Sequence, residues 1–230
     1  MSNSLLVEYY KQIPAGRSNA KPKMTRKEAI AAFRRRIAER SSEGTLLRVL
    51  EHGDSDSRRA ALLALGLLGT MNACPAIAAR LRDDDREIAQ MATDTLWTLW
   101  FRGDSPPHNE ELQRLARLRD REKALAGLDA LIRRAPNFAE AYNQRAIVYF
   151  RLKQFDRSLA DCEKVLEMNP YHFGAQAGLG QCCLQMRKHR AALKAFRNAL
   201  RINPNMDGVA ETIRALENAL GEEGRRDEKK

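Results

Sequence analysis

Three prolines at intervals of 34 residues constrain the fold of this chain more than any other feature of its sequence. Ala135-Pro136, Asn169-Pro170 and Asn203-Pro204 each close an amphipathic run. Because a proline ring clashes with the preceding helical turn, each of these positions is expected to end a helix. A fixed period of this kind is typical of a helical hairpin that is copied and stacked, each copy burying its apolar face against the next. The sequence therefore predicts an all-α chain, and more narrowly an alpha-solenoid of antiparallel helix pairs.

The 34-residue period divides the C-terminal half into repeats and a final helix. The repeats span 105–138, 139–172 and 173–206, and a capping helix is predicted over 206–220. A closing helix is expected because the last repeat of a stack would otherwise leave its apolar face bare. Residues 221–230 contain no apolar side chain and are predicted to be a disordered tail.

Small side chains stand where the two helices of a repeat must cross. They are Ala146 and Ser158 in the second repeat, AEAYNQRAIVYFRLKQFDRSLADCEKVLEMNP, and Gly180 and Ala192 in the third. Because of these small residues and the spacing of the prolines, the stretch from about residue 105 to residue 220 resembles a tetratricopeptide repeat (TPR) domain. The first repeat departs most from the family pattern, because Leu112 stands where a small residue is usual.

A second period, of 31 residues, covers the preceding stretch. Like residues recur at this interval in four pairs: Leu50 and Leu81, Asp54 and Asp85, Ala61 and Ala92, and Leu65 and Leu96. Each copy is predicted to be a helix that ends near an aspartate-rich turn, followed by a second helix. The stretches HGDSDSRRAALLALGLLG and RDDDREIAQMATDTLWTL resemble HEAT-like repeats, over about residues 44–102. We therefore expect a HEAT-like domain over 24–104, stacked on the TPR domain of about three units at 105–220.

The N-terminal residues combine positive charge with the start signal of a helix. Residues 1–40 hold 10 Lys and Arg against 3 Asp and Glu, within a chain of formal net charge +10. Residues 1–23 are predicted to be a flexible arm, in which LLVEYY is a candidate docking helix. Thr25 and Glu28 then form a capping-box pattern, which opens a basic helix ending near Arg40.

This basic helix allows two interpretations. One is a site for nucleic acid or another anionic surface, because clustered basic side chains bind phosphates. Its candidate residues are Lys23, Arg26, Lys27, Arg34, Arg35 and Arg36. The other interpretation is a terminal capping helix whose outer face is simply solvated.

Two interpretations also stay open for the aromatic residues Trp97, Trp100 and Phe101. They stand opposite the apolar stripe of their helix, just before the Gly-Asp-Ser-Pro-Pro turn at 103–107. One interpretation is a buried junction with the first TPR helix. The other is an exposed docking patch.

We find no residue pattern that predicts catalysis, a cofactor or a metal. The four histidines fall at predicted loops or helix ends without metal-binding spacing and are interpreted as surface residues: His52, His108, His172 and His189. The four cysteines form no CxxC pair and are expected to be buried free thiols: Cys74, Cys162, Cys182 and Cys183. No apolar run reaches the roughly 20 residues that span a bilayer, and the start lacks a signal-peptide pattern. The expectation is a cytoplasmic protein that is not an enzyme.

The TPR resemblance implies a concave groove lined by the first helix of each repeat. In that family the groove side chains stand at the second, fifth, ninth, twelfth and thirteenth positions. In this sequence the corresponding residues are Glu140, Asn143, Ile147, Phe150, Arg151, Ala177, Gln181, Leu184 and Gln185. Family members that hold chaperone tails ending in EEVD need basic side chains where this chain has Gly174 and Gly178, so no such clamp is expected.

The resemblance thus implies a non-enzymatic adaptor or scaffold that binds a protein segment or peptide in the TPR groove. The alternative is binding of nucleic acid or an anionic surface through the basic arm and helix. A third hypothesis, an accessory subunit of a lyase or other enzyme, lacks any supporting catalytic residue.

Overall fold

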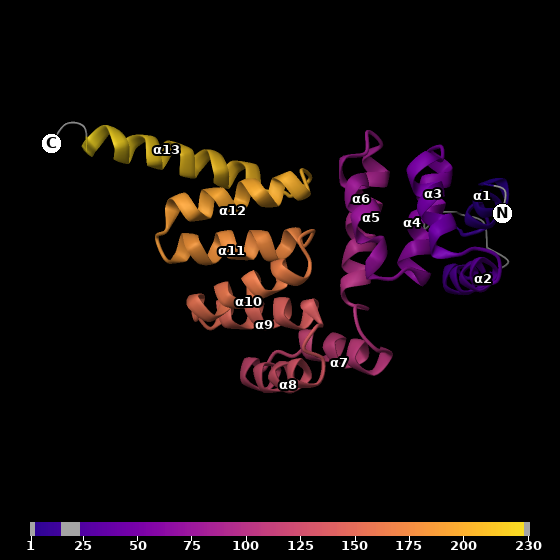
Figure 1. Cartoon of the computed structure of the whole chain (residues 1–230), viewed down its shortest axis with the longest axis horizontal. Helices are drawn as coiled ribbons and strands as arrows, with labels where there is room; N and C mark the ends of the chain where they lie inside the picture. Colours follow the sequence, from indigo (N-terminus) through magenta and orange to yellow (C-terminus); the bar gives the residue numbers. More distant parts are fainter. Residues whose placement is uncertain (1–2, 15–23, 228–230) are drawn as a thin grey trace. The chain divides into compact units, whose positions relative to one another are not determined.

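The computed structural model describes residues 3–14 and 24–227 of the chain (Figure 1). The described residues form thirteen α-helices and two short 3-10 helices, and none of them lies in a strand. Successive helices pack pairwise in two compact units, residues 1–99 and 100–230. This arrangement confirms the predicted all-α fold of repeated helix pairs.

The first unit contains α1 to α6 and both 3-10 helices. Their bounds are α1 Asn3–Lys11, α2 Arg26–Ala38, α3 Glu43–His52, α4 Ser55–Leu68, η1 Met71–Ala73, α5 Cys74–Ala79, η2 Arg80–Arg82 and α6 Arg86–Trp100. Helix α3 packs against α4 and α5, while α1 and α2 both pack against α4.

Equivalent residues of the 31-residue period have the same roles in the structure. The carboxylate of Asp54 accepts a hydrogen bond from the Ser57 amide at 2.8 Å, and that of Asp85 accepts from the Glu87 amide at 2.9 Å. Each aspartate thereby caps the second helix of its pair. The six apolar members of the paired positions are all buried: Leu50, Leu81, Ala61, Ala92, Leu65 and Leu96.

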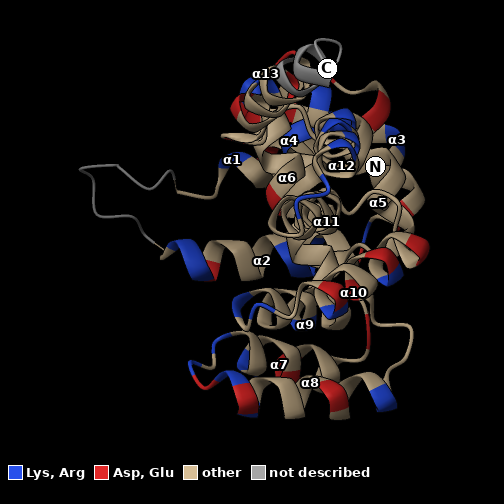
Figure 2. Ribbon diagram, turned by 90° about the vertical axis from the view of Figure 1, so that its left-hand side faces the viewer, with Lys and Arg blue, Asp and Glu red and all other residues tan. Residues whose placement is uncertain are grey.

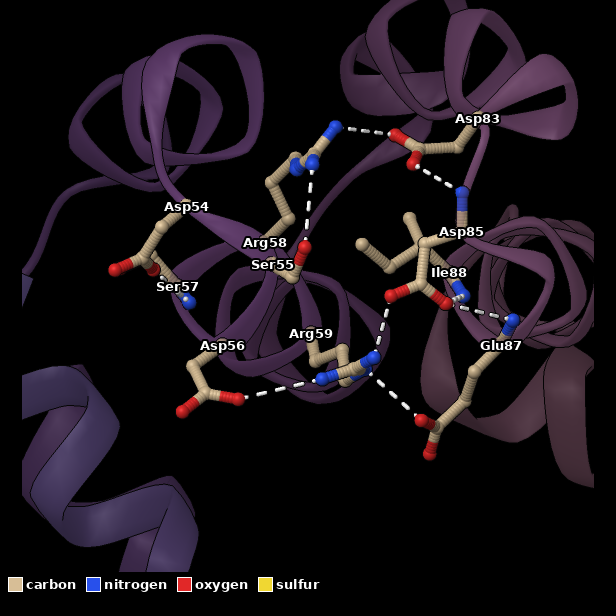
Figure 3. A network of polar contacts seen from close by, with 10 residues as sticks. All are labelled: Asp54, Ser55, Asp56, Ser57, Arg58, Arg59, Asp83, Asp85, Glu87 and Ile88. Carbon is tan, nitrogen blue, oxygen red and sulfur yellow. Dashed lines mark hydrogen bonds and ion pairs between the residues drawn. The ribbon is translucent and has the colours of Figure 1, made fainter.

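An ion-pair network joins the two capping turns of the first unit (Figure 3). The guanidinium of Arg58 donates to Asp83 at 2.6 Å, and that of Arg59 pairs with Asp85 and with Glu87. Asp83 also accepts the amide of Asp85 at 3.1 Å. The acidic run before α6 is therefore explained by helix capping and by these two arginines.

The N-terminal helix α2 starts as predicted. The Thr25 hydroxyl accepts the Glu28 amide at 3.3 Å, and the Glu28 carboxylate accepts the Thr25 amide at 2.8 Å. Both halves of the capping box are thus present. The apolar residues Ala29, Phe33 and Ile37 are buried on one side of the helix.

The expectation of a flexible arm is wrong for residues 3–11, which form α1. Leu6 is buried, and Lys11 pairs with Asp56 of α4 at 2.7 Å. The alternative interpretation of LLVEYY as a docking helix is the correct one. Residues 15–23 of the predicted arm lie outside the described residues.

The second unit contains α7 to α13, which pack in sequence (Figure 1). Their bounds are α7 Pro106–Ala116, α8 Arg121–Arg134, α9 Ala139–Arg151, α10 Phe155–Met168, α11 Phe173–Gln185, α12 His189–Ile202 and α13 Val209–Asp227. The three repeats predicted from the prolines therefore each form a helix pair. The closing helix, predicted over 206–220, begins three residues later at Val209 and continues through Asp227. The prediction of a disordered tail is therefore wrong for residues 221–227.

The Asn-Pro dipeptides end helices in the way that the sequence predicts. Helices α10 and α12 end one residue before Asn169 and Asn203, which are both buried. The side-chain oxygen of Asn169 accepts the Tyr171 amide at 3.2 Å, and that of Asn203 accepts the Asn205 amide at 3.0 Å. Each asparagine thus shapes the turn beyond its helix as the proline prevents continuation.

Small residues lie at the helix crossings, as the repeat pattern requires. In the second repeat the Ser158 hydroxyl donates to the Ala146 carbonyl at 2.8 Å, which links the two helices where they approach. In the third repeat a Cβ atom added to Gly180 would lie 2.9 Å from the ring of Phe196. The glycine therefore makes room for an aromatic side chain of the facing helix.

Trp100 and Phe101 belong to the interior of the second unit. Trp100 is 1% exposed, and its ring stacks on that of His172 with centroids 4.0 Å apart. Phe101 is half-buried and packs against an apolar cluster formed mainly by α7 and α8. The exposed-patch interpretation is therefore wrong for Trp100, while Trp97 lies in the first unit and is half-buried.

The Gly180 contact gives a test of the repeat register. Gly180→Leu is expected to lower the free energy of unfolding by about 1–3 kcal/mol, because the larger side chain overpacks the contact with Phe196. Urea unfolding followed by circular dichroism measures the change. The matched control is Gly44→Ala in α3, where an added Cβ meets no atom within 4 Å, so it is expected to be neutral or stabilising. Equal effects of the two substitutions would contradict the register.

Candidate functional site

The predicted groove residues lie on α9 and α11, the first helices of the second and third repeats, which contact each other. Along these helices the structure divides them by exposure. Four are exposed, three are half-buried and two are buried: Ile147, Arg151, Gln181 and Gln185; Phe150, Ala177 and Leu184; and Glu140 and Asn143. The accessible members thus come mainly from the C-terminal halves of both helices.

Glu140 and Asn143 do not line an open groove. One Glu140 carboxylate oxygen accepts from the Asn143 amide at 3.0 Å and from the Gln144 amide at 2.6 Å. The other oxygen lies 2.9 Å from Nε2 of His172, and both of these side chains are fully buried. The prediction that Glu140 and Asn143 are groove contacts fails here, because their polar atoms satisfy one another in the interior.

The hydrogen bonds of His172 define its tautomer. Its Nδ1 atom accepts the Ala175 amide at 3.0 Å and caps the start of α11. Because Nδ1 is an acceptor, the ring proton is on Nε2 and is donated to Glu140. The interpretation of the histidines as surface residues is therefore wrong for His172, which connects the start of α9 with the start of α11.

Ile147 and Phe150 supply the apolar part of the accessible surface. Ile147 is 36% exposed, although most large apolar side chains of the described chain are covered. Phe150 is half-buried, and its ring meets Phe155 of α10 edge-on with centroids 5.4 Å apart. Phe150 therefore contributes to both the surface and the packing of its own repeat, whereas Ile147 is the better probe of binding alone.

Arg145 fixes α9 against both neighbouring second helices. It donates to Asp161 of α10 at 2.7 and 2.8 Å and to Asp129 of α8 at 2.7 Å. Hydrogen bonding to Asp161 raises the pKa of this guanidinium despite its partial burial. Asp129 and Asp161 each stand 16 residues from Arg145 in the sequence. This equal spacing was the one sequence signal for the contact, and it was not used to predict it.

The cysteines are confirmed as buried free thiols. Burial raises the pKa of the Cys162 thiol to about 12, and burial also raises the pKa values of Cys182 and Cys183. Since the thiolate is the reactive form, these side chains are packing residues. Among the described residues, no group of three or more His, Cys, Asp or Glu side chains is placed to hold a metal ion.

Figure 2 shows the Lys and Arg positions of α2 in blue. By their contacts these basic residues fall into two groups. Arg36 donates to Gln12 at 2.7 Å and lies over the ring of Tyr9, so this predicted anion-binding residue is used to hold the N-terminal segment. The other candidates with described positions remain exposed: Arg26, Lys27, Arg34 and Arg35. Lys23 lies outside the described residues.

Helix α2 and the end of α4 border a pocket of about 550 Å³. Its lining combines basic and apolar side chains: Lys27, Arg34, Arg35, Ile30, Ala31, Ala38, Leu67 and Leu68. The basic residues of this pocket were among those predicted from the sequence to bind anions. The contribution of α4 came only from the structure, because nothing in the sequence pairs these two helices.

Comparison with protein-family models identifies both kinds of repeat. The tetratricopeptide repeat model matches residues 139–172 and 175–206, and the HEAT repeats model matches residues 16–97. The chain therefore contains HEAT repeats followed by tetratricopeptide repeats, which confirms both resemblances. The first predicted TPR repeat, 105–138, is not within the matched ranges, in keeping with its departure from the pattern.

Two relatives match less than half of the chain. A TPR repeat-containing protein of Rhizobium etli is 33% identical over 97 residues, which are 42% of this chain and 48% of that protein. Hsp70-Hsp90 organizing protein 1 of Glycine max is 29% identical over 92 residues, which are 38% of this chain and 16% of the relative. The chain thus spans less than half the length of either protein.

A similar arrangement of helices occurs in a solved structure, the first TPR of Spaghetti (RPAP3) bound to the HSP90 peptide SRMEEVD. The match has 22% sequence identity and a TM-score of 0.46, and it covers 49% of this chain and 89% of that one. Within the part of the chain that is described here, no helix is long and apolar enough to cross a membrane.

The buried contact between His172 and Glu140 is expected to stabilise the second unit. His172→Leu leaves the Glu140 carboxylate without one buried donor and removes the cap of α11, so we expect a loss of about 2–4 kcal/mol in urea unfolding. Glu140→Leu combined with His172→Leu should recover part of the loss, because no buried carboxylate then lacks its donor. The exposed His52→Ala is the control, with a change below about 0.5 kcal/mol. A stability of His172→Leu equal to that of the control would contradict the assignment.

Proposed function

We propose that this chain is a non-enzymatic adaptor that binds an extended peptide segment of a protein partner along the C-terminal halves of α9 and α11. The observation that carries the proposal is the exposure of Ile147 on the groove helix of a TPR repeat. Protein recognition surfaces combine an apolar centre with a polar rim, and Ile147 supplies apolar area on a helix that also carries polar side chains.

The neighbouring side chains indicate what the peptide would look like. Ile147, with the half-buried Leu184, offers apolar contact to one or two apolar side chains. Gln181 and Gln185 are exposed and carry amides that both donate and accept, which suits the backbone of an extended chain. Arg151 supplies one positive charge at the end of α9.

A chaperone tail ending in EEVD is not the ligand that we propose. Such a ligand brings several carboxylates, yet the positions that would meet it include Gly174 and Gly178, which carry no charge. The HSP90 peptide in the RPAP3 structure and the names of the organizing proteins describe those relatives. For this chain we propose an internal segment with an apolar anchor, and a cytoplasmic location that suits four buried free thiols.

Peptide selection tests the groove directly. Random peptides displayed on phage are selected on the full chain, and the recovered peptides are measured by fluorescence polarisation. Ile147→Asp is expected to weaken their binding by at least about tenfold, because a charged group replaces the apolar contact. The peptide SRMEEVD serves as a second probe and is expected not to bind.

Tyr171→Asp is the matched control, because Tyr171 has the same 36% exposure but lies in the turn before α11. It should leave the affinity of the selected peptides unchanged, and circular dichroism should show both variants folded. Selected peptides that bind Ile147→Asp as tightly as the unaltered chain would place their site elsewhere and refute the proposed groove.

A further inference from the structure

The pocket between α2 and α4 combines features that a merely solvated helix would not need. Its floor contains apolar side chains from both helices, with Ile30 from α2 and Leu67 and Leu68 from α4. All three are only half-buried, so the apolar area remains partly open. The buried stripe of α2, which holds Phe33, faces the core and is separate from this surface.

Three cations border this floor without acidic partners. Lys27, Arg34 and Arg35 are exposed, and none of them forms an ion pair with another described residue. Other arginines of the same unit are paired, as Arg58 is with Asp83. The nearby carboxylate of Glu28 is occupied by the capping box. The side chains that line the pocket therefore include three cations and no carboxylate.

The pocket residues that α2 contributes lie along one side of that helix. Lys27, Ala31, Arg34 and Ala38 are three or four residues apart, so they fall on one face of the helix. Small residues thus alternate with the cations and leave room beside α2 for another rod-shaped element. The opposite wall is the C-terminal end of α4.

We infer that this pocket binds an amphipathic helix of a partner protein whose polar positions are mainly Glu and Asp. Its apolar face would cover Ile30, Leu67 and Leu68, while its carboxylates would lie beside Lys27, Arg34 and Arg35. This is the helix-in-groove mode of recognition, with charge complementarity at the rim. The inference concerns the first unit and does not rest on the peptide groove of the second.

The lining favours this ligand over nucleic acid. Single-stranded nucleic acids are held by aromatic side chains on which bases stack, together with a basic track. No aromatic residue lines the pocket, and its floor is aliphatic. A phosphate backbone would leave that aliphatic surface uncovered, whereas an amphipathic helix would cover it and pair with the cations.

A pair of designed peptides tests the inference. The probe is a fluorescein-labelled peptide of about 18 residues, long enough to form a helix, with Leu at three- and four-residue spacing and Glu at most other positions. The control peptide replaces every Glu by Lys. In fluorescence polarisation at low salt the Leu/Glu peptide should bind the full chain, and the Leu/Lys peptide should bind at least about tenfold more weakly.

Variants locate the site. The double variant Arg34→Glu with Arg35→Glu should weaken binding of the Leu/Glu peptide by at least about tenfold. The control double variant, Arg48→Glu with Arg86→Glu, changes the net charge equally at exposed positions outside the pocket and should change binding by less than about threefold. Ala31→Asp changes a single exposed residue of the pocket wall and should also weaken binding. This single variant keeps the test valid if the double variant does not fold.

Three results would overturn the inference: equal effects of the two double variants, no binding of the Leu/Glu peptide, or equal binding of both peptides. A labelled single-stranded DNA is measured in parallel. Tighter binding of the DNA, lost in the Arg34→Glu with Arg35→Glu variant, would assign the pocket to nucleic acid instead.

Discussion

The close crossing of paired helices at small side chains is the constraint on which the TPR unit depends. Gly180 admits the ring of Phe196, and Ala146 lies close enough for its carbonyl to accept the Ser158 hydroxyl. At these crossings the apolar side chains of the two helices pack against one another, and each helix pair also packs against the next pair. The repeats are therefore held by neighbour contacts, and the groove surface is whatever the first helices leave uncovered.

The repeat architecture was predictable because its determinants recur at fixed intervals. Pro136, Pro170 and Pro204 mark the helix ends, and Asp54 and Asp85 cap equivalent helices. Local signals such as the Thr25 capping box could also be recognised in the sequence. A periodic sequence encodes each contact more than once, so an error at one position does not displace the whole assignment.

Contacts that occur only once were the ones that the sequence did not reveal. His172 was predicted to be a surface histidine, but it pairs with Glu140 at the start of α9 and stacks on Trp100. Likewise, α1 was assigned to a flexible arm, although Leu6 and Lys11 attach it to the first unit. Such contacts depend on which residues the folded chain brings together, and no single stretch of sequence contains that information.

These isolated contacts also change which of the predicted groove residues are accessible. Family positions alone predict that Glu140 and Asn143 line the groove. In the structure both side chains are buried, and their hydrogen bonds join them to each other and to His172. The accessible surface that remains is centred on Ile147 and the amides of α11. In the first unit, the same reasoning separates Arg36, which holds the N-terminal segment, from the unpaired cations of the α2 pocket.

The most direct test of this account is site-specific photo-crosslinking in cells that naturally make the protein. A photoreactive phenylalanine analogue is placed at Ile147, and in a separate chain at Ala160, which is exposed on α10, the second helix of the same repeat. The account predicts a discrete adduct with another polypeptide from position 147 and none from position 160. Absence of an adduct at 147, or the same adduct from both positions, would contradict a peptide-binding groove on α9 and α11.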